Sequence, residues 1–260
     1  MELYAVKTRR VKVGDSLFDV ILDSLASQNI QLCESDVLAV ASKIVSYSEG
    51  RLVKLSDVKP SKRAAALAEE YCLKPEFAEL ILQEGEEFYG GVDRAVLTLK
   101  RSVLAPNAGI DNKNAPAGFV VLWPADSKRT AVLLRKEIAE RTGTSVGVMI
   151  VDSNLVPLRI GTSGLALAVA GFKPIKDYRK DRDIFGKPIV ITRLAVADDL
   201  ASAAHLLMGE SNEGTPLVLV RKVSLDFVDR AYDARDMMMP PDDCIFMSAF
   251  LGGRLRSRWK

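Results

Sequence analysis

The stretch SVGVMIVDSN, residues 145–154, contains an apolar run that is rich in β-branched side chains and ends at Asp152. Because the run does not alternate with polar residues, it predicts a strand that is covered on both faces. Further strands are predicted in VLAVASKIVS (37–46), AVLTLK (95–100), FVVLWP (119–124), PIVITRLAVA (188–197) and TPLVLVRKV (215–223).

Helices are predicted between these strands. They are expected over residues 15–27, 61–86 with a break at Pro75, 127–141 between a Ser cap and Gly143, and 198–208 before Gly209. Helices and covered strands together predict a mixed α/β fold.

No Gly/Ser-rich or Pro-rich linker divides the chain. We expect residues 1–223 to form one functional region, with a polar excursion at 172–187 that leaves open whether it has one lobe or two. Residues 224–260 show no clear periodicity, so the sequence assigns them no packing.

The composition excludes several classes of protein. A formal net charge of +2 over 260 residues is too small to indicate a nucleic-acid or membrane partner. No apolar run approaches the ~20 residues of a membrane span, and the N-terminus lacks the pattern of a secretory signal. The three scattered cysteines form no disulfide framework, so a cytoplasmic protein is expected.

His205 is the one histidine of the chain. It lies among small and apolar residues of a predicted helix, where a packed or surface histidine is a more frequent finding than a catalytic one. A zinc site of the usual His and Cys type therefore has few ligands. Any metal site should use carboxylates and hydroxyls, which favours Mg²⁺ or Mn²⁺.

Three acids, Asp111, Asp152 and Glu210, each stand where a regular element gives way to a polar loop. Asp111 lies in PNAGIDNKNAPAG, residues 106–118, a loop dominated by Asn, Ala, Pro and Gly. Carboxylates at such positions commonly hold a hard cation against a phosphate. The alternative is that each acid is an ordinary turn residue.

Three other segments could bind an anion. GESNEGTP, residues 209–216, could turn backbone N–H groups toward one, or could simply be a capped helix-to-strand loop. Ser42 and Lys43, in ASKIVSYSEGR (41–51), could bind phosphate, or could belong to an edge strand that turns at Gly50. Arg159 stands beside glycines and could grip a carboxylate, or form a surface salt bridge. The P-loop and GxGxxG patterns are both absent from the sequence.

The order of these segments resembles the coenzyme F-420:L-glutamate ligase family, the gamma-glutamyl ligases, over about residues 5–222. The matching strings are KVGDSL, SKIVSYSEGR, NAGIDNKN, the strand that leads into DSN, RIGTSGLALAVAGFKPIKDYRKDRDIFGKPI, ADDLASAAHLLMGE and PLVLVR.

The resemblance implies a ligase that adds L-glutamate to a carboxylate of a deazaflavin phospholactate through an acyl phosphate. It implies GTP as co-substrate, Mn²⁺ or Mg²⁺ as cofactor, K⁺ as an optional further cation, and an intertwined homodimer. Small molecules are its expected partners, without nucleic acid or membrane.

The resemblance also implies roles for particular residues. Metal ligands would be Asp111, Asp152, Ser153 and Glu210, and the catalytic set would be Asp111, Asp152 and Arg159. Nucleotide contacts would be Val13, Gly14, Ser42, Lys43, Asn114, Met208, Gly209, Ser211, Asn212 and Gly214.

The chain departs from the family pattern at two places. Tyr47 stands where the family usually has a lysine, and a lost charge-assisted contact costs roughly 1.5–3 kcal/mol of affinity. Asn154, Leu155 and Val156 replace a Phe-Gly-Arg string. These departures keep two alternatives open: a family ligase with another acid or amine, and a non-catalytic homodimer that binds a nucleotide or cofactor.

Overall fold

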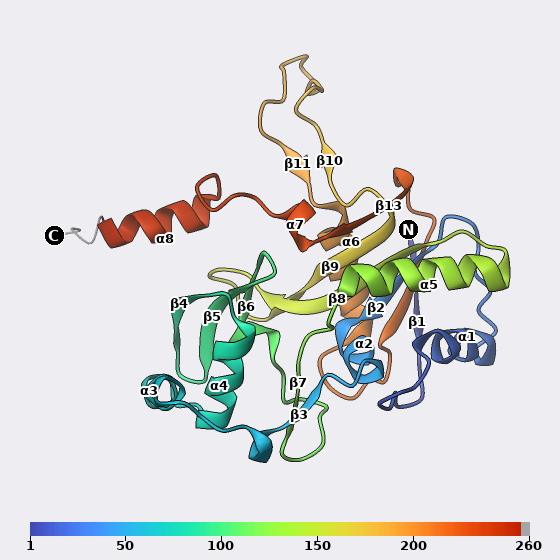
Figure 1. Cartoon of the computed structure of the whole chain (residues 1–260). Helices are drawn as coiled ribbons and strands as arrows, with labels where there is room; N and C mark the ends of the chain where they lie inside the picture. Colours follow the sequence, from blue (N-terminus) through green and yellow to red (C-terminus); the bar gives the residue numbers. More distant parts are fainter. Residues whose placement is uncertain (256–260) are drawn as a thin grey trace.

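A six-stranded sheet forms the centre of the protein (Figure 1). The computed structural model describes the backbone of residues 1–255 and the side chains up to residue 250. In spatial order, the strands are β1 (Glu2–Val6), β12 (Leu217–Arg221), β2 (Val37–Ala41), β8 (Gly147–Leu155), β9 (Thr162–Phe172) and β13 (Phe227–Asp233). Strands β2 and β8 pair in parallel, and the other neighbours pair antiparallel. The predicted mixed α/β class is confirmed.

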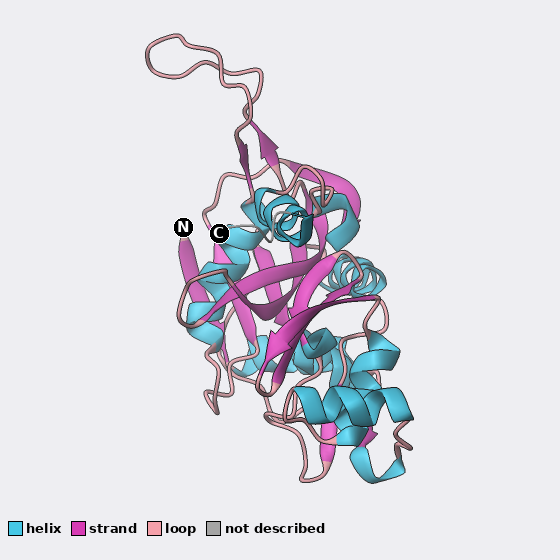
Figure 2. Ribbon diagram, turned by 90° about the vertical axis from the view of Figure 1, so that its left-hand side faces the viewer, coloured by secondary structure: helices cyan, strands magenta, loops and turns pink. Residues whose placement is uncertain are grey.

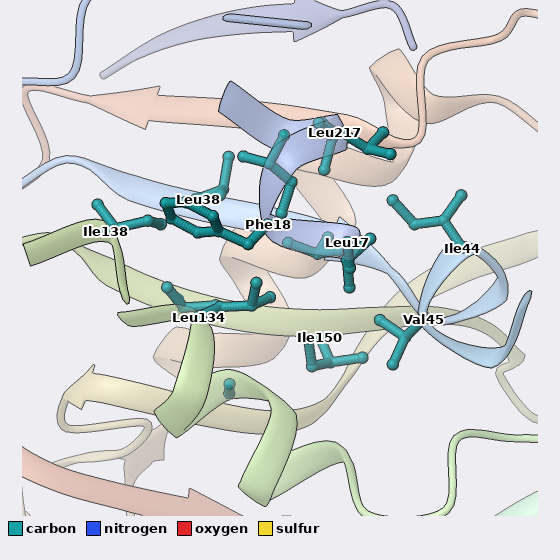
Figure 3. Packing of buried hydrophobic residues seen from close by; sticks show 14 of the residues in the cluster. Leu17, Phe18, Leu38, Ile44, Val45, Leu134, Ile138, Ile150 and Leu217 are labelled. Carbon is teal, nitrogen blue, oxygen red and sulfur yellow. The ribbon is translucent and has the colours of Figure 1, made fainter. Parts of the chain in front are cut away.

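Helices cover both faces of this sheet. Helices α1 (Leu17–Ser27) and α5 (Ser127–Thr142) pack on one face, and α6 (Val196–Met208) packs on the other. Ile150 belongs to the first core together with Leu134 and Leu38 (Figure 3), whereas Met149 belongs to the second. Successive residues of β8 thus enter opposite cores, which explains why the run that ends at Asp152 is apolar throughout.

A smaller lobe lies within residues 52–122. It contains the antiparallel sheet β4 (Glu87–Val92), β5 (Ala95–Lys100) and β6 (Val103–Pro106), the pair β3 (Leu52–Lys54) and β7 (Phe119–Val121), the short η1 (Leu55–Asp57), and helices α3 (Lys62–Glu70) and α4 (Pro75–Glu84). Figure 2 shows its helices at the end of the molecule opposite the protruding hairpin. The predicted break at Pro75 is confirmed, since this proline is the first residue of α4.

A hairpin of β10 (Lys176–Asp177) and β11 (Arg193–Leu194) projects from the body (Figures 1 and 2). The predicted strand over 188–197 is therefore wrong: only Arg193 and Leu194 pair as a strand, and α6 begins at Val196. Residues 189–191 are apolar, but the hairpin has no sheet neighbour to cover them, and both Val190 and Ile191 are exposed.

The C-terminal part contributes β13 to the sheet edge, followed by α7 (Ala234–Met237) and α8 (Ile245–Leu255), which extends away from the body (Figure 1). The end of the segment 224–260 that the sequence left unassigned lies outside the described residues. Within the described part, no helix has both the length and the apolarity of a membrane-spanning segment.

The structure corrects the prediction for residues 42–46. Strand β2 ends at Ala41, and a short helix, α2 (Ser42–Ser48), begins at once. Helical winding places both Ile44 and Val45 against the core of α1 and α5, whereas a strand would send them to opposite faces. The alternative of an edge strand turning at Gly50 is wrong for the same reason.

Strand β8 is longer than predicted, and strand β9 was not predicted. Strand β8 continues through Asp152 to Leu155 because it stays paired with the unpredicted strand β9. Gly164 lets β9 approach α6, since a Cβ at this position would lie 2.2 Å from the carbonyl oxygen of Ala201. The cap of α5 is the side chain of Asp126, not the predicted serine.

Candidate functional site

Four segments that are far apart in the sequence meet beside the end of β2. The backbone N–H of Thr8 donates to the carbonyl of Gly214 at 3.1 Å, which joins the N-terminal segment to the loop after α6. Asn114 Nδ2 donates to the Ser211 carbonyl at 2.8 Å, and the Tyr47 hydroxyl donates to the Asn114 carbonyl at 2.7 Å. The loops that the sequence singled out therefore form one site.

Asp152 is the most enclosed carboxylate of this site. Ser42 Oγ donates to its Oδ1 at 3.0 Å, and the indole N–H of Trp123 donates to its Oδ2. Burial raises the pKa of Asp152 to about 6, and the two hydrogen bonds oppose this shift without cancelling it.

Trp123 was not among the predicted site residues. Its side chain is buried, and Gly109 makes room for it, because a Cβ at Gly109 would lie 2.2 Å from the indole ring. Gly109 has a φ of +68° in the short η2 (Asn107–Gly109). The available signal was a tryptophan at the end of FVVLWP, directly after the strand that follows the Asn/Gly-rich loop.

Asp111 is paired with Lys43. The Lys43 ammonium contacts Asp111 Oδ2 and also donates to the Lys113 carbonyl at 2.9 Å. The Lys113 backbone N–H donates to Asp111 Oδ1 at 2.8 Å, and the backbone of Asp111 exchanges two hydrogen bonds with Val121. The loop thereby holds its carboxylate in a defined place beside a cation.

Glu210 accepts hydrogen bonds from Thr162 Oγ1 at 2.6 Å and pairs with His205 Nε2 at 2.9 Å. The Lys113 ammonium lies 3.5 Å from its other oxygen. Burial disfavours its charge, but the hydrogen bonds of Thr162, His205 and Ser153 outweigh burial and lower the pKa of Glu210 to about 2. Glu210 is therefore ionised at neutral pH. His205, expected to be a packed or surface residue, contacts the site.

The loop after α6 already binds the carboxylate of one of its own residues, Glu213. The Ser211 backbone N–H donates to the Glu213 carboxylate at 2.8 Å, and hydrogen bonds from backbone N–H groups lower the pKa of Glu213. Gly209, with a φ of +71°, comes so close that a Cβ there would lie 2.2 Å from this carboxyl group. Successive N–H groups turned toward one carboxylate form a nest that suits an anion.

The remaining predicted nucleotide residues lie at the edges of the site. Val13 is 62% exposed, Gly14 has a φ of +83°, and Val13 lies close to Gly50 at the end of α2. Met208 is buried at the end of α6, and Asn212 is exposed in the loop that follows.

Arg159 is separate from these groups. It lies in the exposed turn between β8 and β9, beside the fully exposed Leu158 and Ile160. Its backbone N–H donates to Val156, but its side chain makes no hydrogen bond or ion pair with any described residue.

Within residues 1–250, no group of three or more His, Cys, Asp or Glu side chains is gathered closely enough to hold a metal ion. Asp111 instead contacts Lys43, and Asp152 accepts a hydrogen bond from Ser42, the preceding residue of α2. Glu210 is hydrogen-bonded to Ser153. Each of these acids thus contacts different neighbouring residues, and Lys43 is the cation that Asp111 contacts.

Comparisons with known proteins give the family to which the sequence is similar. Residues 5–222 match the sequence model of the family F420-0:Gamma-glutamyl ligase. The chain is 39% identical to the coenzyme F420:L-glutamate ligase of Methanopyrus kandleri, covering 92% of this chain and 94% of that protein. It is 36% identical to the proteins of the same name from Methanothermobacter thermautotrophicus (81% and 84% covered) and Archaeoglobus fulgidus (83% and 84%).

Proposed function

The chain belongs to the F420-0:gamma-glutamyl ligase family, and from this premise we propose that it forms an amide between a carboxylate of a deazaflavin phospholactate and the amine of L-glutamate. GTP and a divalent cation, Mn²⁺ or Mg²⁺, are the proposed co-substrate and cofactor. The observation that carries the proposal is that the loop of Asp111 is joined to the anion-binding loop at 209–214, which contains Glu210, while Asp152 accepts a hydrogen bond from Ser42 at the start of α2.

The chemistry of the donor atoms suits a hard cation. Asp111, Asp152, Ser153 and Glu210 offer carboxylate and hydroxyl oxygens, which Mg²⁺ and Mn²⁺ prefer. Asp111 already attracts a cation, the Lys43 ammonium. When bound, the metal would supply positive charge that neutralises the phosphates during transfer.

The nucleotide would occupy the loop from Met208 to Gly214 and the start of α2. Its phosphates would replace the Glu213 carboxylate as the anion in the backbone nest, because both ligands use the same N–H groups. Lys43 would exchange its partner Asp111 for a phosphate, and Asn114, which is tethered to Ser211, would set the position of the loop at 106–118.

In the proposed reaction, an oxygen of the substrate carboxylate attacks the γ-phosphorus of GTP, and GDP leaves. The amine of glutamate then attacks the acyl carbon, loses a proton, and expels inorganic phosphate. The protein's part is to place the reactants and to exclude water from the acyl phosphate. Trp123 supports this by closing one side of Asp152.

A homodimer is part of the proposal. Four apolar residues of the projecting hairpin, Ile184, Phe185, Val190 and Ile191, are between 72% and 94% exposed. An apolar group of this kind on an extended arm favours burial against another chain. Light scattering should give twice the chain mass, and Phe185→Asp should weaken the association.

A family ligase that acts on a different acid or amine is the second candidate. It is favoured by Asn154, which is one of the residues at which the chain departs from the family pattern. The Asn154 amide donates to the Leu104 carbonyl at 2.9 Å and so connects the end of β8 to the small lobe. The test is turnover with the deazaflavin phospholactate, GTP, Mn²⁺ and L-glutamate. The proposal predicts an amide product with release of GDP, whereas GTP consumption that requires another acid or amine would favour the second candidate.

A non-catalytic binding protein would bind GTP without consuming it. In the turnover assay, Asp111→Asn should abolish product, while Asp93→Asn, in the exposed turn between β4 and β5, serves as the matched control. Equal product from both variants would contradict the role of Asp111.

A further inference from the structure

A cavity of about 260 Å³ lies between the small lobe, the end of β8 and the C-terminal segment. Leu104 and Leu155 contribute aliphatic side chains to its lining, and Met237–Met239 contribute thioethers. None of these residues belongs to the predicted metal or nucleotide sets. The cavity is therefore distinct from the predicted metal and nucleotide sites.

The lining suits a flat aromatic group. Leu155, Met238 and Met239 are 54%, 39% and 49% exposed, so apolar surface faces an open concave space. Methionine side chains adapt their shape and make favourable contacts between sulfur and aromatic rings. An apolar pocket with a small number of polar groups is the usual form of a site for an organic ring.

Asp198 supplies a polar group to this lining. Its Oδ1 accepts the backbone N–H of Ala166 at 3.0 Å, which fixes the carboxyl group at the start of α6. Its Oδ2 makes no hydrogen bond to any described residue. That oxygen can accept an N–H group from the edge of a heteroaromatic ring.

The cavity is also next to the candidate active site. Asn154 lines it and stands two residues after Asp152 on β8. Side chains two residues apart on a strand point to the same face and are about 7 Å apart at 3.3 Å per residue. A ligand in the cavity can thus extend a chain toward Asp152 along one face of the sheet.

We propose that this cavity binds the planar ring system of the acid substrate, while the carboxylate at the other end of that molecule reaches the site around Asp152. The inference rests on the proposed function, in which the acid is a deazaflavin. It identifies where the aromatic half of the substrate is recognised, and it makes Leu155 and Met238 specificity residues.

The experiment uses the deazaflavin riboside, which has the ring but lacks the phospholactate, titrated into the full-length protein without nucleotide. Its own absorbance and fluorescence report binding. Leu155→Glu and Met238→Glu each place a charge in the lining at a partly exposed position, where folding should tolerate it. Val132→Glu, on α5 and outside the cavity, is the matched control at 42% exposure.

We expect the intact protein and Val132→Glu to bind the riboside equally, and the two cavity variants to bind it at least tenfold more weakly. Circular dichroism should show all four proteins folded. Absence of riboside binding by the intact protein, or unchanged affinity in both cavity variants, would overturn the assignment.

Failure of the proposed function has a different signature. Riboside binding with the expected variant pattern, but without Mn²⁺-dependent GTP binding, would retain the cavity assignment and refute the GTP-dependent ligase. Glutamate addition by a protein that does not bind the riboside would retain the ligase and refute the cavity assignment.

Discussion

Two groups of charged side chains flank Trp123, and they differ in how completely they are closed. On one side, Lys100 is 2% exposed, donates to Glu84 at 2.6 Å and lies 5.4 Å from the indole centre. Arg51 completes this group by donating to both oxygens of Glu84 at 3.0 and 3.1 Å. On the other side, Lys43 and Asp111 pair while 27% and 38% exposed.

The difference separates charges that support the fold from charges that are available to a ligand. In the closed group, Lys100, Glu84 and Arg51 satisfy one another within the protein. In the open group, Asp111 is held by the partly exposed Lys43, a contact that solvent or a ligand can replace at small cost. Trp123 is the boundary between the two groups.

The largest expected effect comes from opening the closed group. Lys100→Met removes the buried cation and leaves Glu84 with Arg51 alone, which should destabilise the protein by about 3–5 kcal/mol. Urea unfolding measures the change. A loss below about 1 kcal/mol would show that the closed group behaves like a surface pair and would remove the distinction.

Asp152→Asn should stabilise the protein instead of destabilising it. The folded-state pKa of Asp152 is about 6 against an ordinary 3.8, so stability falls as pH rises between these values. The variant has no charge to bury and should be up to about 3 kcal/mol more stable than the intact protein near pH 7. The difference should vanish below the ordinary pKa, and unfolding curves at several pH values would measure it. A pH-independent difference would contradict the burial of this charge.

Trp123→Phe tests whether the indole N–H of Trp123 positions the Asp152 carboxylate. It keeps most of the ring but removes the N–H that Asp152 accepts, and a hydrogen bond to a charged group contributes about 2 kcal/mol. A double-mutant cycle with Asp152→Asn measures the coupling. Additive effects would mean that the indole only fills space and does not position the carboxylate.

The smallest effect is expected for Tyr47→Phe. The hydroxyl donates to the Asn114 carbonyl at 2.7 Å in a partly exposed place, so its loss should cost about 0.5–1 kcal/mol. Phenylalanine should leave nucleotide affinity nearly unchanged if Tyr47 only fastens the loop. A large loss of GTP affinity would show that the hydroxyl contacts the nucleotide.

Much of the fold could be predicted from local pattern. The apolar run before Asp152 predicted a covered strand, and Pro75, Gly143 and Gly209 marked helix boundaries, because these features depend on neighbouring residues. Strand β9 could not be predicted in the same way. Its glycines resemble those of a loop, whereas Gly164 is needed because Ala201 of α6, 37 residues away, approaches the strand there.

The acidic residues of the candidate site could be predicted from the sequence, but the contacts that they make could not. Asp111, Asp152 and Glu210 were identified by their positions at the ends of elements and by resemblance. The partners Trp123 and His205 were missed. Trp123 meets Asp152 only through a hydrogen bond between residues 29 positions apart, and His205 resembles an ordinary helix residue. Lys43 was predicted as a phosphate contact, and its pairing with Asp111 depends on the unpredicted helix α2.

Calorimetric titration of GTP, with and without Mn²⁺, tests the central claim that the open group is a nucleotide and metal site. The intact protein and Asp93→Asn should bind GTP tightly in the presence of Mn²⁺, and Asp152→Asn should lose the dependence on the metal while remaining folded. GTP binding that is the same with and without Mn²⁺, or that is unchanged in Asp152→Asn, would contradict the account.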